Sequence, residues 1–311
     1  MTIQAATEAV GRAARWRPRE YAFWTIAGLS WFALPGQHLL LNEIAIFALF
    51  GLSLDLVIGY GGIVSLGHAA FFGTGAYVAG LIAKHTSIDP VFALAAALAA
   101  ASLLGALSSL LVLRGSDLSR IMVTLSVALV LFELANRLTA ITGGADGLQG
   151  ITVGPILGLF EFDIFGHVAY AYSLIVLFLA FLLIRRIMHA PFGWSVRAMK
   201  GNPLRTAAIG IPVNGRLIAI YSIAAATAGA AGALLAQTSA FVSLDVLAFH
   251  RSADVMLMLV VGGVGYLYGG LIGAAVFKLM QDWLSTLTPQ YWQFWIGLLL
   301  VILVLANPRR A

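Results

Sequence analysis

NEIAIFALFGLSLDLVIGYGGIVSLGHAAFFGTGAYVAGLIA, residues 42–83, is the stretch that decides the fold class of this chain. It contains two acids, Glu43 and Asp55, and no Lys or Arg. One crossing of a bilayer takes about 20 mostly apolar residues. The stretch therefore predicts two consecutive membrane crossings, 42–60 and 61–83.

The rest of the chain has the same character. Of its 311 residues, 61% are hydrophobic and 10% are charged, whereas a soluble domain has roughly 45–50% apolar and about 25% charged residues. This composition excludes a water-soluble fold, and its low charge excludes intrinsic disorder. We expect an all-α polytopic membrane protein with about ten segments, several of them short or broken, at 21–41, 42–60, 61–83, 90–113, 118–138, 166–188, 217–238, two within 253–282, and 291–306.

The run 253–282 counts as two segments because glycines interrupt it. As one helix it would be about 45 Å long, too short for two full crossings of a core about 30 Å thick. The breaks fall at Gly262-Gly263-Val264-Gly265 and at Gly269-Gly270. Irregular backbone at membrane depth must be covered by protein or line a wet cavity.

The positive charge predicts the orientation. Twelve of the 18 Lys and Arg residues lie in three places, residues 1–20, the loop 185–216 and the tail 307–311. The loop alone has six basic residues and no acid, which exceeds the net charge of +5 of the whole chain. By the positive-inside rule we expect a cytoplasmic N-terminal arm (1–20), one transmembrane domain (21–306) with a cytoplasmic loop, and a cytoplasmic tail. The 143–165 connection, with three acids and no Lys or Arg, is then outside.

Three single basic residues, Lys84, Arg137 and Arg251, depart from this pattern. Arg137 follows Glu133 at i,i+4 spacing, which predicts an ion pair on one helix. The acids in or near segments are Glu43, Asp55, Glu133, Asp254 and Asp282, each near a predicted segment end or a Gly break. We favour interfacial or helix-pairing roles for them over functional ones, although acids inside membranes are functional candidates.

The sequence lacks the residue patterns that several kinds of chemistry require. The chain has no Cys, and none of its three lysines is followed by Ser or Thr as a phosphate-binding loop requires. Its six His residues do not have metal-ligand spacing. We expect no enzyme activity, metal or cofactor in this chain, and no nucleic-acid partner, because its charge is explained by membrane topology.

Half of residues 59–80 are Gly or Ala. The pairs Ala69/Gly73, Gly75/Ala79 and Ala76/Gly80 predict close helix packing. Ser65 and His68 have i,i+3 spacing, which would place them on one helical face, either as a polar site on a translocation path or as an interhelical hydrogen-bond pair. The predicted path residues are Gly61, Gly62, Ser65, Gly67, His68, Phe71, Phe72, Gly262, Gly263 and Gly265.

The basic loop contains a short helix with signals at both ends. Asn202 followed by Pro203 predicts its start, and Gly210 followed by Pro212 predicts its end. A helix of about two turns is unstable alone in water, so we expect it to bind a partner, with Leu204 and Ile209 in a groove and Arg205 facing an acid. The alternative is a charged loop that serves topology only.

Four stretches of the sequence resemble a known family of membrane proteins. GYGGIVSLGHAAFFGTGAY (59–77), NPLRTAAIGI (202–211), ADVMLMLVVGGVGYLYGGLIGAA (253–275) and the closing apolar segment with NPRR (307–310) are similar to Liv-type ABC permeases, the membrane subunits of branched-chain amino acid importers, and in particular the M-type subunit. The resemblance covers the chain from about residue 41 onward.

The resemblance implies a type II ABC importer permease fold in a bacterial inner membrane. It implies a homologous H-type permease subunit, two ATP-binding subunits that hold ATP and Mg, and a soluble substrate-binding protein. It also implies that the loop holds the coupling helix, made by Asn202, Pro203, Leu204, Arg205, Ala207, Ala208, Ile209 and Gly210, with Arg205 or Thr206 at the Glu position of the EAA-loop pattern.

Two other functions remain open from the residues. An ion-coupled secondary transporter of a small amino acid or amide would use Asp55 or Asp254 as a proton or sodium site, and its two Gly-interrupted regions would fit a repeat-built transporter. A structural or assembly subunit would leave Ser65 and His68 unexplained.

Overall fold

The computed structural model describes residues 16–86, 88–287, 289–291, 293–298 and 301. Most of the predicted N-terminal arm, the whole 307–311 tail and much of the last predicted segment lie outside these residues. The described chain is helical, and its β pairing consists of two isolated bridges, Leu148–Val242 and Ile156–Phe160. The predicted all-α class is confirmed.

The helices follow one another in this order: α2 (Pro18–Ala33), α3 (His38–Asp55) with its π-helical continuation η1 (Leu56–Tyr60), α4 (Ala69–His85), α5 (Pro90–Val112), α6 (Asp117–Arg137), α7 (Thr139–Thr142), the 3-10 turn η2 (Gly144–Asp146), α8 (His167–His189), α9 (Pro191–Gly201), α10 (Pro203–Ala208), α11 (Val213–Ser239), the 3-10 turn η3 (Leu244–Leu247), α12 (Phe249–Gly262) and α13 (Gly269–Leu287).

Five described helices are long and apolar enough to cross a membrane: His38–Tyr60, Pro90–Val112, Leu118–Arg137, His167–His189 and Val213–Ser239. The remaining large helices fall short of this measure. α2, α4 and α12 have 16, 17 and 14 residues, and α13, with 19 residues, is not apolar enough. The prediction of several short segments is therefore confirmed.

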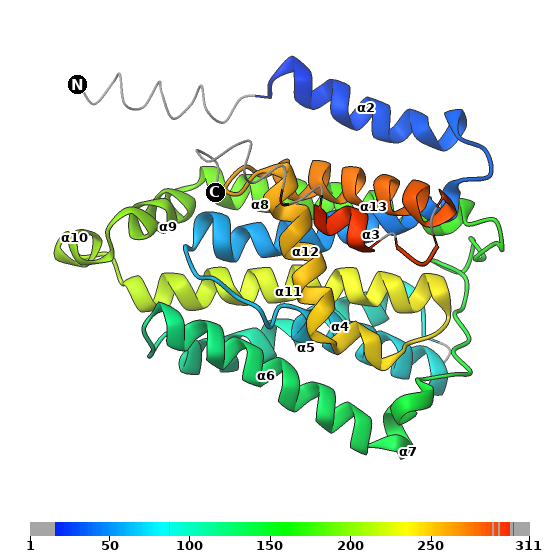
Figure 1. Cartoon of the computed structure of the whole chain (residues 1–311), viewed down its shortest axis with the longest axis horizontal. Helices are drawn as coiled ribbons and strands as arrows, with labels where there is room; N and C mark the ends of the chain where they lie inside the picture. The colour runs from blue at the N-terminus through cyan, green and yellow to red at the C-terminus, as the bar shows by residue number, and fades with distance from the viewer. Residues whose placement is uncertain (1–15, 87, 288, 292, 299–300, 302–311) are drawn as a thin grey trace.

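The helices form a bundle whose long members run side by side (Figure 1). α9 and α10 project at one end of the bundle, which we call the α9–α10 end, and α7 lies at the opposite end. α2 and α6 lie along opposite edges, and α12 runs obliquely to the long helices.

The predicted boundaries of the first three segments are wrong. The first break falls at residues 34–37, not between 41 and 42. Pro35 disfavours helix at Leu34, and Gly36 has φ +94°. The third segment becomes helical only at Ala69, because residues 61–68 are irregular. A hydropathy pattern registers apolar side chains but not these backbone requirements.

The break predicted within 253–282 is confirmed. α12 ends at Gly262 and α13 begins at Gly269. Between them Gly263 and Gly265 have φ of +101° and +80°, a conformation that glycine adopts at little cost. The chain turns here, so two short helices replace one long one.

Small residues bring α4, α5 and α11 together. A Cβ atom at Gly75 would lie 2.0 Å from the Gly229 carbonyl oxygen, and one at Gly229 would lie 2.3 Å from Ala101 Cβ. Backbones approach this closely only where side chains are small. The predicted packing role of the small residues in α4 is confirmed.

The outer helices present apolar side chains to the surroundings. On α6, Met122 and Val130 are 61% and 65% exposed, as suits a lipid-facing helix. Its Arg137 Nε lies 2.6 Å from Glu133 Oε1, so the predicted i,i+4 pair is confirmed.

Candidate functional site

α10 is the short capped helix that the sequence predicts. Asn202 Oδ1 accepts a hydrogen bond from the Arg205 backbone N–H at 3.0 Å, and Pro203 is its first residue. Thr206 is buried, and its hydroxyl donates to the Asn202 carbonyl at 2.9 Å. Ile209 is the C-cap, and Gly210, at φ +85°, turns the chain away.

The outer face of α10 has no cover in the described chain. Leu204 is 83% exposed and Ile209 is 74% exposed, and Arg205 is exposed between them. A helix this short does not persist in water without support, and in the described chain α9 and α11 contact it. This exposed face lies at the α9–α10 end of the bundle (Figure 1).

α9 connects α10 to the membrane helices. Lys200 Nζ donates a hydrogen bond to the Gly59 carbonyl at 2.7 Å. The Arg197 guanidinium lies over the Tyr60 ring, 5.1 Å from its centroid, a favourable cation–π arrangement. The last turn of the α3–η1 helix is thus fixed to the helix that precedes α10.

The same turn meets the second Gly-rich break. Asp55 is fully buried, and its Oδ1 accepts a hydrogen bond from the Gly265 N–H at 2.6 Å. A Cβ atom at Gly59 would lie 2.0 Å from Asp55 Oδ1 and 2.6 Å from Gly265 N. The structure therefore brings together the two Gly-rich breaks, through a hydrogen bond between residues 210 apart in the sequence.

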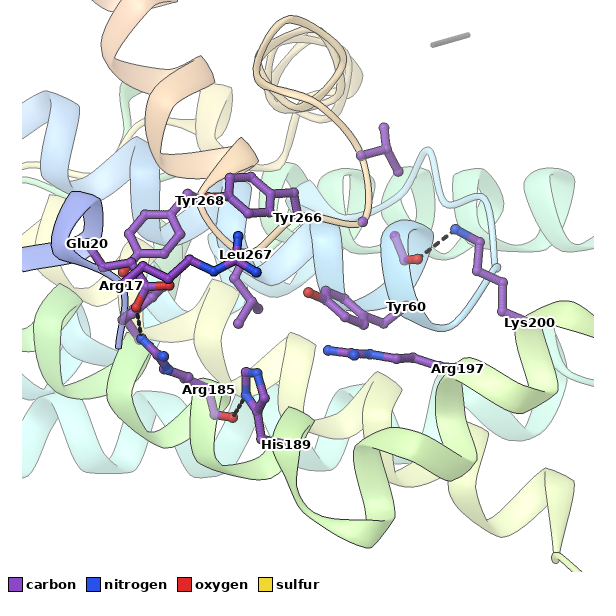
Figure 2. Close-up of a pocket in the computed structure, with 14 residues that line it drawn as sticks. Arg17, Glu20, Tyr60, Arg185, His189, Arg197, Lys200, Tyr266, Leu267 and Tyr268 are labelled. Atoms are coloured by element: carbon purple, nitrogen blue, oxygen red, sulfur yellow. Dashed lines mark hydrogen bonds and ion pairs between the residues drawn. The ribbon is translucent and has the colours of Figure 1, made fainter. Parts of the chain in front are cut away.

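A cavity of about 510 Å³ opens beside this contact, and we call it the basic cavity. Figure 2 shows the Arg185–Glu20 ion pair on one side of it, with Tyr60, Arg197 and Lys200 on the other. It is lined by Arg17, Glu20, Gly59, Tyr60, Phe181, Arg185, His189, Arg197, Lys200, Val264, Gly265, Tyr266, Leu267 and Tyr268. Four Arg or Lys side chains against one Glu give this cavity a positive field.

One sequence interpretation of Ser65 and His68 is wrong. Ser65 lies in the irregular segment and His68 is the N-cap of α4, so the two do not share a helical face. Both are fully buried, and His68 Nε2 lies 2.9 Å from Ser53 Oγ on α3. The polar contact of His68 is therefore between α3 and α4.

The other predicted path residues lie in three different places. Phe71 and Phe72 are buried in an aromatic core, with Phe72 4.6 Å from Phe50 between ring centroids. Gly67 packs against α6, where a Cβ atom would lie 1.8 Å from the Thr124 carbonyl oxygen. The other glycines, Gly61, Gly62, Gly262, Gly263 and Gly265, lie in or beside the two breaks.

The path role of these residues stays a prediction. His68→Leu tests it through transport at unchanged expression, since normal transport would remove His68 from the pathway.

The sequence does not identify Lys200 as a contact residue, since it contributes there only to the charge of the loop. For Asp55 the favoured interfacial or helix-pairing role agrees with its hydrogen bond to Gly265, but the sequence does not identify that partner. Local spacing cannot pair Lys200 with Gly59, because 141 residues separate them. The available signal was an acid in an apolar stretch directly before a Gly-rich break.

Comparison with known proteins agrees with this architecture. The family described as "Branched-chain amino acid transport system / permease component" matches residues 38–304. The chain is 27% identical over 290 residues to the high-affinity branched-chain amino acid transport system permease protein LivM of Escherichia coli (strain K12), covering 85% of this chain and 67% of the relative. LivM of Salmonella typhimurium (strain LT2) gives the same identity and coverage.

A relative with a different named substrate also matches. The ribose import permease protein RbsC of Bacillus subtilis (strain 168) is 29% identical over 290 residues, covering 88% of this chain and 84% of the relative. No solved structure matches the chain. Since the family covers most of its residues and five described helices can span a bilayer, the chain belongs to the permease components of branched-chain amino acid transport systems, as a multi-pass membrane permease of the Liv type.

Proposed function

We propose that this chain is one of two membrane subunits of an ATP-driven importer of branched-chain or related hydrophobic amino acids. α10 carries this proposal, because an exposed apolar face on a capped helix has no function in a transporter that works alone. Two ATP-binding subunits bind at the α9–α10 end and hold ATP and Mg. A homologous H-type permease completes the pathway, and a soluble binding protein delivers the substrate.

The contacts around α9 suggest how ATP binding by the partner changes the packing of the membrane helices. A displacement of α10 by its partner moves α9, and with it Lys200 and Arg197. These two side chains hold Gly59 and Tyr60, and the same turn holds Gly265 through Asp55. The coupling works as a population shift, because the ATP-bound partner favours one of two packings around the two Gly-rich breaks.

The substrate assignment rests on the relatives. Two of them are named as branched-chain amino acid permeases, and one is named as a ribose permease. An apolar path suits leucine, isoleucine or valine, and the binding protein supplies much of the selectivity.

Vesicles test the proposal. We expect leucine uptake only when this chain, its permease partner, both ATP-binding subunits, the loaded binding protein and ATP are present. Uptake driven by a proton or sodium gradient without the ATP-binding subunits would overturn the proposal in favour of a secondary transporter. ATP-dependent uptake of ribose but not leucine would overturn the substrate class alone.

Arg205→Glu tests the coupling surface. We expect the variant to hydrolyse ATP without transporting leucine, because a reversed charge on the exposed face of α10 opposes an acidic partner group. Arg114→Glu is the matched control, since Arg114 is also an exposed basic residue in a connection between helices but lies outside α10. Normal leucine transport per ATP in Arg205→Glu would contradict the assigned contact.

A further inference from the structure

A second group of charged residues lies away from the α9–α10 contacts, and we call it the charged cluster: Glu43, Asp245, Arg251, Asp254 and Lys278. Lys278 Nζ lies 2.6 Å from Glu43 Oε1. The Arg251 Nε–H donates to Asp245 Oδ2 at 2.8 Å. Four separate elements, α3, η3, α12 and α13, contribute these side chains.

Both cations of the cluster face the same aromatic ring. Lys278 Nζ is 4.1 Å and Arg251 Cζ is 5.7 Å from the centroid of Phe47 on α3. Lys278 is at the midpoint of α13, and its side chain is 5% exposed. Lys278 is therefore buried between the helices, where an ionised group is costly unless it is paired or wet. The side chains of Glu43, Asp245 and Arg251 are 43%, 38% and 25% exposed, so the cluster extends from this buried lysine to the surface of the bundle.

Helix pairing explains only part of the cluster. It accounts for Lys278 with Glu43 and for Arg251 with Asp245. Asp254 forms no hydrogen bond or ion pair with other described residues, although it lies one turn from Arg251 on the same face of α12. The Asp245 bonds use Nε and Nη2 of Arg251, so Nη1 makes no hydrogen bond within the described chain. Each of the two residues keeps capacity for a further charged partner.

A cavity of about 630 Å³ lies where that partner would bind. This volume falls in the range of roughly 300–1,000 Å³ that small-molecule sites have. One part of its wall is charged or polar and includes His250, Arg251 and Asp254. Another part is apolar, with Leu257 on α12, Phe277 on α13 and Ile296.

We propose that this cavity binds the zwitterionic head and the apolar side chain of an amino acid as it crosses the membrane. Arg251 binds the carboxylate, Asp254 binds the ammonium group, and Leu257, Phe277 and Ile296 contact the side chain. An uncharged sugar would offer no ionic group to Asp254 or to Nη1 of Arg251. The inference rests on the proposed function and adds the residues that recognise the substrate within the membrane.

The test uses the complete transporter in vesicles with saturating, leucine-loaded binding protein. Asp254→Asn removes a charge at nearly constant shape, and Arg251→Gln removes a charge while keeping a shorter polar side chain. We expect each to lower leucine uptake by about tenfold to hundredfold, since a hydrogen bond between charged groups is lost. ATP hydrolysis stimulated by the binding protein should persist, because α10 is unchanged.

Conservative and matched variants separate binding from folding. Asp254→Glu keeps the charge and should restore most of the uptake. Glu133→Gln removes an acid from an exposed pair on α6 that lines neither cavity, and it should transport leucine normally. Wild-type uptake in Asp254→Asn and Arg251→Gln, or equal losses in Asp254→Glu and Asp254→Asn, would overturn the inference. A wild-type complex that moves no amino acid with ATP would instead contradict the proposed function.

Discussion

Gly59 is the residue at which the two Gly-rich breaks pack most tightly. In Gly59→Ala the new methyl group would overlap Asp55 Oδ1 and Gly265 N, so the Asp55–Gly265 hydrogen bond must lengthen or break. We expect a destabilisation of about 1–3 kcal/mol, measured as a lower thermal-unfolding midpoint of the purified protein. Gly28→Ala on α2 is the control, because its new Cβ would have no neighbour within 4 Å from the described chain outside the adjacent residues and the backbone of its own helix. Equal midpoints for the two variants would contradict the tight contact.

At the residue scale, the sequence predicted local hydrogen bonds better than contacts between residues on different helices. It identified Asn202 as a cap because capping is local, and the hydrogen bond to Arg205 is three residues away. It paired His68 with Ser65 for the same reason, since both lie in one stretch. The true neighbour, Ser53, is on the preceding helix, and only the turn through residues 61–68 brings it close.

The cap of α10 allows a prediction at the element scale. Asn202→Ala removes a capping hydrogen bond worth about 1 kcal/mol from a helix that has few other supports. We expect faster amide hydrogen exchange across residues 204–209, an unchanged global unfolding midpoint and less leucine transported per ATP. Ser116→Ala is the control, because Ser116 is the N-cap of α6 but its side chain makes no capping bond. Unchanged exchange in Asn202→Ala would show that α10 does not depend on this cap.

The start of α8 gives a prediction about pH. Asp163 accepts hydrogen bonds from the backbone N–H groups of His167 at 3.2 Å and Val168 at 3.0 Å. Burial alone would raise its pKa, but these bonds and the one to the His167 ring outweigh burial and lower the pKa from 3.8 to about 2. A pKa that is lower in the folded state stabilises the fold above the unfolded value, and this stabilisation is lost as pH falls through the folded value.

We therefore expect Asp163→Ala to have a lower unfolding midpoint than the native chain near neutral pH. The difference should stay constant down to about pH 4 and shrink between about pH 4 and 2. Asp146→Ala, in the same connection, should show no such pH-dependent difference. A difference that grows on acidification would contradict the assigned cap.

At the element scale, predictions succeeded where backbone and hydropathy signals coincide. The break between α12 and α13 was predictable because paired glycines interrupt the apolar run there. The start of α4 was not, since residues 61–68 are as apolar as the helix that follows. Their irregular path depends on contact with α6, at Gly67 and Thr124, and no local pattern contains that contact.

At the scale of the whole molecule, the sequence predicted a helical membrane protein but not the charged cluster. Arg251 is a single charge in the sequence, Lys278 has no predicted role there, and the helix-pairing role favoured for Glu43 comes without a partner. Lys278 and Glu43 are 235 residues apart and meet because α13 packs against α3 at Gly51 and Gly270. The charged cluster is thus a product of tertiary packing. In the hydropathy of the sequence its only trace is that α13 is less apolar than the other long helices.

The orientation of the whole chain is the last prediction. Six basic residues and no acid lie in 185–216, whereas the 143–165 connection has three acids and no Lys or Arg. α10 and α7 lie at opposite ends of the bundle (Figure 1). The positive-inside rule then places α10 in the cytoplasm. The chain contains no Cys, so one introduced Cys reports one position. We expect an impermeant maleimide to label Glu161→Cys in intact spheroplasts and Leu204→Cys only after permeabilisation. The reverse pattern would place α10 outside and separate it from any ATP-binding subunit.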